Sequence, residues 1–313
     1  MPIWSQILNE LKENEVKGIQ APLDVVRRKY LAELYKYSDR NCILYASGWL
    51  QKSNTSSSLV SINDEDIQAF MEVSNGLKGD KLDFILHSPG GSPEAAEAIV
   101  LYLRSRFSDI RVIVPQLAMS AATMIACSAD TVVLGKHSFL GPVDPQILAS
   151  TSLGTRLVST QAVLDQFDLA QKECSDLDKL SAWLPMLSQY GPDLLIQCHS
   201  ALEMSKSLVE GWLKTYMFKN DQDGPRKAKR ISDWLASHEN FNSHARHISR
   251  SEMEEYELKV FHLEKDPQLQ DLALSVFHAT THTFTQTPAV KIVENHTGRA
   301  FVKMEFVQPV PSG

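Results

Sequence analysis

Ser120 is the residue of this sequence whose surroundings best suit a nucleophile. It lies in the run Ala-Met-Ser-Ala-Ala-Thr (residues 118–123), shortly after Arg111–Pro115, an apolar stretch predicted to be a buried strand. A short helix is expected to begin at Ser120, and the unpaired N–H groups and positive dipole end of a helix N-terminus favour a developing oxyanion. The small neighbouring residues would let a substrate backbone approach closely. The alternative is that Ser120 only caps the helix, which is the commoner role of a serine there.

A second turn that could take part in chemistry lies about thirty residues earlier, at Ser-Pro-Gly-Gly (residues 88–91). It follows Leu82–Leu86, another predicted buried strand. Gly90 and Gly91 permit backbone conformations that other residues avoid, so N–H groups exposed there could receive an oxyanion or pair with an extended peptide. Alone, this motif indicates only a turn. Together, the two turns would put an oxyanion donor beside a nucleophile.

Strand and helix signals alternate from about residue 40, and this order determines where the two turns should lie. Ser92 is a suitable N-cap for a helix with Pro93 at its first position, and a third buried strand is predicted at Thr131–Leu134. Strand–helix–strand repeats of this length imply right-handed crossovers and a mostly parallel sheet. Sites in such sheets lie beyond the carboxyl ends of the strands. We therefore expect both turns at the same edge of the sheet.

The rest of the chain reads as helical additions and a terminal hairpin. After Asp144 the pattern is helical, with a long helix predicted over residues 192–218, and Ala289–Glu294 and Ala300–Phe306 alternate like the strands of a hairpin. The basic run at residues 226–230 reads as a solvated loop. At the N-terminus, apolar residues fall on one helical face, which we expect to dock on the protein itself or on a partner subunit. These are Ile3, Trp4, Ile7, Leu8 and Leu11.

Composition and charge narrow the class of protein. The 313 residues are 43% hydrophobic and 22% charged, which is typical of a folded chain, and the formal net charge of −7 argues against a nucleic-acid-binding protein. No apolar stretch approaches the roughly 20 residues of a membrane span, and the N-terminus lacks the basic region of a signal peptide. We expect a cytoplasmic protein whose four scattered cysteines are reduced, with Cys127 serving only in packing.

Four motifs in order carry a resemblance to a known family. They are Ser-Pro-Gly-Gly at 88–91, Ala-Met-Ser-Ala-Ala-Thr at 118–123, Ala-Asp-Thr-Val-Val at 129–133 and Leu-Gly-Pro-Val-Asp-Pro-Gln at 140–146. This set resembles the serine dehydrogenase proteinase family of the Clp protease and crotonase superfamily, which is related to the signal peptide peptidase class of serine proteases. The resemblance implies an α/β fold: a Clp protease/crotonase-like ββα spiral with a mostly parallel sheet, helical additions and a C-terminal helix-hairpin extension.

The same resemblance suggests how the chain is divided. Residues 1–38 would form an N-terminal helical arm, and residues 39–220 a Clp-protease-like catalytic domain. Residues 221–313 would be a C-terminal extension that completes the site and makes oligomer contacts. Relatives of this fold usually assemble as trimers, hexamers or rings, so a homo-oligomer is expected.

Site residues follow from the resemblance by position. Ser120 would be the nucleophile, while Gly91 and Ala121, with Gly90 as a neighbour, would supply the oxyanion N–H groups. The family is described with catalytic residues in the order Ser, Asp, His, and the matching candidates here are Asp144 and His244. His244 would accept the proton of the serine and return it to the leaving amine, and Asp144 would hold the imidazole in the required tautomer.

Other roles remain open for these residues. Asp144 precedes a proline and could be a turn residue, or it could touch Ser120 directly. His244 or its neighbour His247 could be an ordinary surface histidine. Signal-peptide-peptidase relatives use a lysine as the base, and Lys172 is the best positional match, which leaves a Ser-Lys dyad as an alternative.

The expected function is that of a serine peptidase acting on peptides or unfolded protein, with no cofactor and no metal. His278 and His282 stand four residues apart on a predicted helix, but threonines separate them and no glutamate follows as in zinc peptidases. Two alternatives remain: a crotonase-like enzyme acting on acyl-CoA thioesters, which would share the oxyanion geometry, and an inactive scaffold with the same fold.

Overall fold

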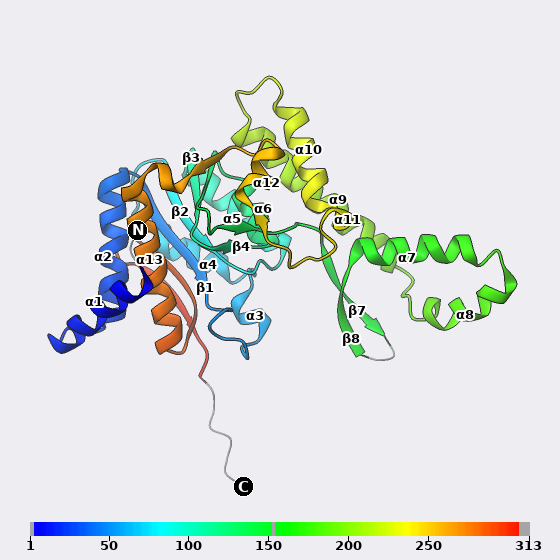
Figure 1. Cartoon of the computed structure of the whole chain (residues 1–313), viewed down its shortest axis with the longest axis horizontal. Coiled ribbons are helices and arrows are strands. Elements are labelled where there is room, and N and C mark those ends of the chain that lie inside the picture. The colour runs from blue at the N-terminus through cyan, green and yellow to red at the C-terminus, as the bar shows by residue number, and fades with distance from the viewer. Residues whose placement is uncertain (1–2, 152–153, 307–313) are drawn as a thin grey trace, which may run out of the picture.

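The computed structural model describes residues 3–151 and 154–306, and most of its strands join one sheet (Figure 1). The strand order in this seven-stranded sheet is β10-β5-β3-β2-β1-β11-β12. All neighbours from β10 to β1 are parallel, whereas β11 and β12 are antiparallel additions at one side. The bounds are β1 Asn41–Ser47, β2 Lys81–His87, β3 Asp109–Val114, β5 Thr131–Leu134, β10 Val260–His262, β11 Ala289–Asn295 and β12 Ala300–Met304. The predicted α/β fold with a mostly parallel sheet is confirmed.

Helices cover both faces of this sheet, so its central strands are largely buried. In β1, Ile43 and Tyr45 pack into the apolar cluster on one face, while Cys42 and Leu44 pack into the cluster on the other. This alternation follows from the two-residue period of a strand. Because both faces are covered, all seven residues of β1 are buried, as is typical of parallel sheets.

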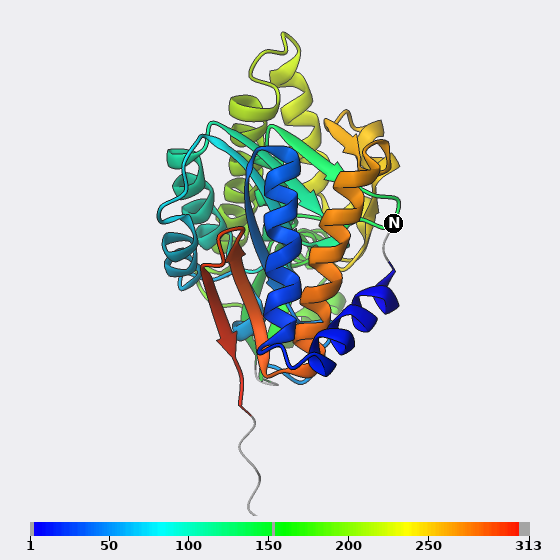
Figure 2. The ribbon, with the colours of Figure 1, turned by 90° about the vertical axis from the view of Figure 1, so that its left-hand side faces the viewer.

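Two antiparallel helices, α2 (Pro22–Ser38) and α13 (Pro267–Gln286), lie side by side across one face (Figure 2). The N-terminal helix α1 (Trp4–Val16) packs beside them, with Ile7 and Leu11 buried against Val26 and Ala279. The predicted apolar face of the N-terminus therefore docks on its own fold through these two residues. The opposite face of the sheet is covered by α4 (Asp66–Ser74), α5 (Pro93–Arg106), α6 (Ala121–Cys127), α9 (Leu194–Trp212) and α10 (Gly224–Ala236).

Shorter elements complete the molecule. A small sheet has the order β4-β6-β9 (Leu117–Ala118, Phe139–Leu140 and Ile248–Ser249). The hairpin of β7 (Gln146–Thr151) and β8 (Gly154–Ser159) leads into α7 (Thr160–Glu173) and α8 (Leu177–Leu187), which project from the body of the molecule (Figure 1). The remaining helical segments are α3 Ser57–Val60, the π-helix Leu213–Met217, α11 His238–Phe241, α12 Arg250–Glu255 and the 3-10 turn Leu263–Lys265.

Several local predictions are confirmed. The three buried strands appear as β2, β3 and β5, and the terminal hairpin as β11 and β12. The Ser92 hydroxyl caps α5 by accepting a hydrogen bond from the N–H of Ala95 at 3.0 Å. The long helix predicted over residues 192–218 is α9 with its π-helical continuation.

Two local predictions were wrong. The basic run at residues 226–230 is not a loop but part of α10, whose Ala228, Ile231 and Leu235 are buried in the core. Its charges lie on the outer face, where Arg230 is 2.9 Å from Glu257. The segment after Asp144 does not become helical at once, since β7 and β8 come first. Nothing in the structure tests the division into residues 1–38, 39–220 and 221–313, which stays a prediction.

Candidate active site

The two turns singled out in the sequence lie against each other at one edge of the sheet. The N–H of Ser88 donates to the carbonyl of Leu117 at 3.1 Å, and the N–H of Met119 donates to the carbonyl of Ser88 at 3.0 Å. These bonds pair the Ser-Pro-Gly-Gly turn with Leu117 and Met119, which flank Ala118 just before Ser120. Because they are backbone bonds, the spacing of the turns does not depend on any side chain.

Gly90 lies directly beside Ser120. Its φ is +95°, and a Cβ at this position would lie 2.5 Å from the carbonyl oxygen of Met119 and 2.7 Å from the Cβ of Ser120. Only glycine tolerates both the conformation and the contact. Gly91 is equally constrained, because a Cβ there would lie 2.2 Å from the carbonyl oxygen of Ile62. Both positions therefore require glycine, because the backbone of another segment lies too close to leave room for a side chain.

Ser120 occupies a strained turn between β4 and α6. Its φ of 49° and ψ of −120° lie in a region that residues with side chains rarely adopt, at a cost on the order of 1–3 kcal/mol. The hydroxyl makes no capping bond to α6, and no described residue shares a hydrogen bond with it. The side chain is partly exposed. The alternative role of Ser120 as a side-chain helix cap is therefore wrong.

Two backbone amides beside this serine lack hydrogen-bond partners among the described residues: those of Gly91 and Ala121. The Ala121 amide is free because it begins α6, where no preceding turn supplies a carbonyl. The Gly90 amide, in contrast, donates to the Ser88 hydroxyl at 3.2 Å. Free amides next to an unbonded hydroxyl are suited to hold a negatively charged oxygen.

Thr123 ties the serine turn to the segment that carries Asp144. Its hydroxyl donates to the carbonyl of Ala118 at 2.7 Å and accepts from the N–H of Gly141 at 2.9 Å. Gly141 packs so closely that a Cβ there would lie 2.7 Å from the terminal methyl of Met119. The motif around residues 140–146 is thereby held against the start of α6.

Asp144 is 1% exposed and accepts hydrogen bonds from two histidines. The Nδ1 of His244 lies 2.7 Å from Oδ1, and the Nδ1 of His238 lies 2.9 Å from Oδ2. A carboxylate can only accept, so both rings carry their proton on Nδ1 and leave Nε2 available to accept another. The two rings are about a quarter exposed, at 22% for His244 and 26% for His238.

The backbone around Asp144 is held on both sides. The N–H of Val143 donates to the carbonyl of Leu235 at 2.8 Å, and the Ser205 hydroxyl donates to the carbonyl of Val143 at 2.7 Å. The Thr160 hydroxyl donates to the carbonyl of Pro145 at 3.1 Å. Asp144 is therefore a buried carboxylate on a firmly held segment, and its hydrogen bonds go to two histidines and not to Ser120.

His238 was missed in the sequence. It begins α11, six residues before His244, in a polar segment without periodicity. One signal for it was present in the sequence: the family order of Ser, Asp and His requires one histidine from this segment, and the segment holds three, at 238, 244 and 247. His247 does not join them, and its ring stacks on Phe139 with centroids 5.4 Å apart.

The alternative base Lys172 lies elsewhere. It is exposed in the last turn of α7, and no contact of its side chain with Ser120 or Asp144 occurs among the described residues. Cys127 is fully buried, and burial raises the pKa of its thiol to about 12, which confirms that it serves in packing. His282 is buried on α13, its Nε2 3.1 Å from the carbonyl of Trp4.

Within residues 3–151 and 154–306, no group of three or more His, Cys, Asp or Glu side chains is arranged to hold a metal ion. In the same part of the chain, no helix has the length and apolar character that a membrane crossing requires.

Comparison with known proteins shows what the segment that carries this site is similar to. The model of the ClpP-like SDH-type serine proteinase family matches residues 59–167, a segment that contains both turns and Asp144. The family resemblance predicted from the sequence is confirmed over this segment, and it implies the Clp protease/crotonase fold.

Two curated relatives, both from Methanocaldococcus jannaschii, are named only as uncharacterized proteins, MJ0137 and MJ1495. The first is 32% identical over 166 residues, which are 50% of this chain and 55% of the relative. The second is 32% identical over 143 residues, which are 43% of this chain and 47% of the relative. The chain thus spans about half the length of the curated relatives it matches, and their names carry no activity.

Proposed function

We propose that this protein is a serine peptidase that cleaves peptide bonds through an acyl-enzyme on Ser120. The observation that carries the proposal is the unbonded Ser120 hydroxyl on a strained strand-to-helix turn, beside the free amides of Gly91 and Ala121. A serine exposed on such a turn is the arrangement that α/β-hydrolases use for their nucleophile. The family match, whose description is that of a serine proteinase, supports a peptide substrate.

In the proposed mechanism, His244 acts as the general base. Its Nε2 takes the proton of the Ser120 hydroxyl while the oxygen attacks the carbonyl carbon of the scissile bond, and the oxyanion is bound by the two free amides. The protonated imidazole then gives this proton to the nitrogen of the leaving amine as the C–N bond breaks. A water molecule, deprotonated by the same histidine, then attacks the acyl carbon. As the ester C–O bond breaks, the imidazolium returns the proton to the Ser120 oxygen and the acyl group leaves as a carboxylic acid.

Asp144 holds the imidazole in the tautomer that this cycle needs. Its Oδ1 accepts a hydrogen bond from the Nδ1–H of His244, so that Nε2 is the nitrogen available to the serine. His238 occupies the other oxygen of the carboxylate and so prevents it from rotating away. We assign His238 the role of a positioning residue that acts through Asp144.

Labelling with a fluorophosphonate probe tests the nucleophile. Wild-type protein should be labelled and Ser120→Ala should not, because the probe reacts only with a serine activated by a neighbouring base. Ser105→Ala, which removes an exposed helix-surface hydroxyl, is the matched control and should label like wild type. Labelling that persists in Ser120→Ala would refute the assignment. A wild type that resists labelling would favour the inactive scaffold.

A further inference from the structure

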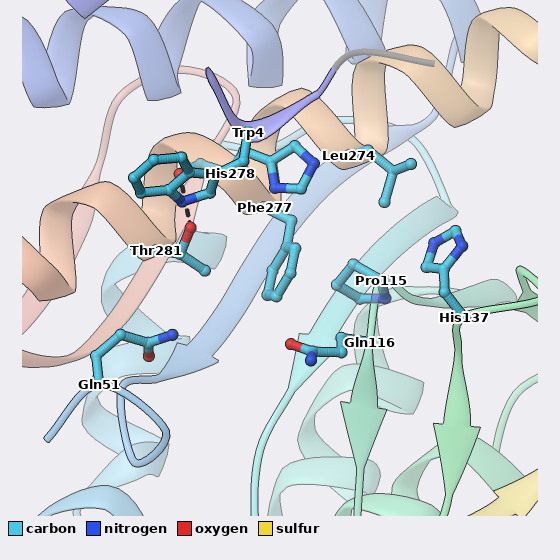
Figure 3. Close-up of a pocket in the computed structure, with 9 residues that line it drawn as sticks. All are labelled: Trp4, Gln51, Pro115, Gln116, His137, Leu274, Phe277, His278 and Thr281. Carbon is cyan, nitrogen blue, oxygen red and sulfur yellow. Dashed lines mark hydrogen bonds between the residues drawn. The ribbon is translucent and has the colours of Figure 1, made fainter. Parts of the chain in front are cut away.

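A cavity of about 410 Å³ lies apart from the candidate active site, between α13 and the carboxyl ends of the parallel strands (Figure 3). Leu274 and Phe277 of α13 form one wall, and Pro115 forms part of the opposite wall. None of the candidate site residues lines it. Its volume lies in the range of roughly 300–1,000 Å³ that is usual for small-molecule sites.

The polar atoms around this cavity are unusually short of partners. Gln51 Oε1 and His137 Nε2 are buried without a hydrogen bond, and both residues line the cavity. His87 does not line the cavity, but its ring contacts that of Phe277 with centroids 4.8 Å apart, and its Nε2 is likewise buried without a hydrogen bond. A buried polar atom without a partner costs about 1–3 kcal/mol, so such atoms are rare in native proteins. The two such atoms on lining residues, Gln51 Oε1 and His137 Nε2, indicate a place where an added molecule would supply hydrogen bonds.

The lining also defines what kind of molecule fits. The residues around the cavity include no aspartate, glutamate, lysine or arginine among those described. Burial lowers the pKa of His137, so its imidazole is neutral near pH 7. Without a lysine or arginine in the lining, a phosphate or carboxylate would find no permanent positive charge here, and burying it would be costly. In Figure 3, the side chains of Gln51 and Gln116 point toward each other across the cavity and offer an amide donor and an amide acceptor.

We propose that this cavity binds a small uncharged molecule that joins an apolar ring to a carboxamide group. The ring packs between Phe277, Leu274 and Pro115, and the carboxamide bonds to Gln51 and Gln116. Trp4, which is 47% exposed, stands at the rim and partly covers the ring. The proposal does not depend on peptidase activity. The proposed ligand would nevertheless lie next to Gln116, which is four residues before Ser120 in the chain.

Phenylacetamide and phenylacetate are suitable probes, because they differ mainly in charge. Saturation-transfer NMR and calorimetric titration of the full chain should show phenylacetamide binding with a Kd on the order of 10 mM or better, as expected for about ten non-hydrogen atoms. Phenylacetate should bind at least about ten-fold more weakly. Equal affinities, or no binding of phenylacetamide, would overturn the proposal.

Variants locate the bound probe. Gln116→Ala and Gln51→Ala should each weaken phenylacetamide binding about five-fold, the usual effect of one lost hydrogen bond. Gln68→Ala, on the exposed surface of α4, is the matched control and should bind like wild type. Ser120→Ala should also leave binding unchanged. Loss of binding in Ser120→Ala would place the probe in the hydrolase site and refute this one.

Discussion

Asp144 is central to the proposed mechanism, because its buried carboxylate accepts hydrogen bonds from two imidazoles. A buried carboxylate needs its hydrogen bonds, so each histidine is held by a strong charge-assisted contact. Their roles nevertheless differ in the proposed mechanism. His244 must use its second nitrogen to move a proton, whereas His238 needs only the nitrogen that faces Asp144.

Asparagine substitutions separate these two roles. The Nδ2 of asparagine can replace the Nδ1 donor of histidine, but asparagine has no group in place of Nε2. His238→Asn should therefore keep kcat within a few-fold, while His238→Ala should lower kcat about ten-fold with KM unchanged. His244→Asn should lower kcat on the order of a thousand-fold or more. Peptide-hydrolysis kinetics would check this, and the reverse order would make His238 the base.

His87 predicts a pH dependence of stability that is independent of catalysis. Complete burial lowers its pKa to about 3, while its Nδ1 accepts a hydrogen bond from the N–H of Leu117 at 3.3 Å. In the unfolded chain the imidazole takes up a proton below pH about 6.5, but in the folded chain it does so only near pH 3. Stability is therefore complete above pH 6.5 and is lost as the pH falls toward 3.

The free energy of unfolding should reflect this difference. His87 should make the protein less stable at pH 5 than at pH 7 by roughly 2 kcal/mol. His87→Asn, which keeps an acceptor for Leu117, should be less stable at pH 7 but should lose less stability on acidification. Denaturant titrations at the two pH values would measure both. An unchanged pH dependence in His87→Asn would show that other groups cause it.

At the scale of elements, the paired turns carry the site, because backbone bonds hold the end of β2 against the start of α6. This contact leaves no room for a side chain at Gly90, whose added Cβ would meet the carbonyl of Met119 and the Cβ of Ser120. Gly76 offers a direct comparison. It has a similar φ of +81°, but nothing lies within 4 Å of the position of its Cβ.

Alanine at these two glycines separates conformational strain from steric conflict. Gly76→Ala should cost only the strain of a positive φ, about 1–2 kcal/mol, and should keep full fluorophosphonate labelling. Gly90→Ala should push the two turns apart and reduce the labelling rate about a hundred-fold or more. Thermal melts and labelling rates of both variants would test this. Normal labelling of Gly90→Ala would mean that the turns need not be in contact.

At the scale of the whole molecule, exposed leucines gather on the projecting arm formed by β7, β8, α7 and α8. Leu148 and Leu157 form a directly opposed pair across the hairpin and are 72% and 59% exposed. Leu177 and Leu184 of α8 are 80% and 55% exposed. Apolar surface of this kind, carried on an extended arm, is typical of an interface between proteins. We propose that the expected homo-oligomer forms through this arm.

A charged pair on the hairpin tests this proposal. Leu148→Glu combined with Leu157→Glu should lower the mass measured by light scattering, because burying two carboxylates in an apolar interface is costly. Arg156→Glu changes the opposite face of the same strand and should leave the mass unchanged. A wild type that is monomeric, or a double variant of unchanged mass, would contradict assembly through this arm.

Much of the fold could be predicted because its signals are local. The strands at Leu82–Leu86, Arg111–Pro115 and Thr131–Leu134 are short apolar runs bounded by turn residues, and Ser92 and Pro93 mark the start of a helix. From their order, the parallel sheet and the neighbourhood of the two turns follow. The hairpin β7–β8 was missed because its alternation is weak and its strands are only partly buried.

The sequence by itself determined which turn follows which strand. From that order it follows that the glycine pair and Ser120 share one edge of the sheet. Only the tertiary structure decided which imidazoles meet Asp144. His238 and His244 lie about a hundred residues further along the chain, in a polar segment with no periodicity, and long-range packing alone brings them back. The same holds for the strained φ of Ser120, which contacts from distant segments impose and which no local preference of serine would produce.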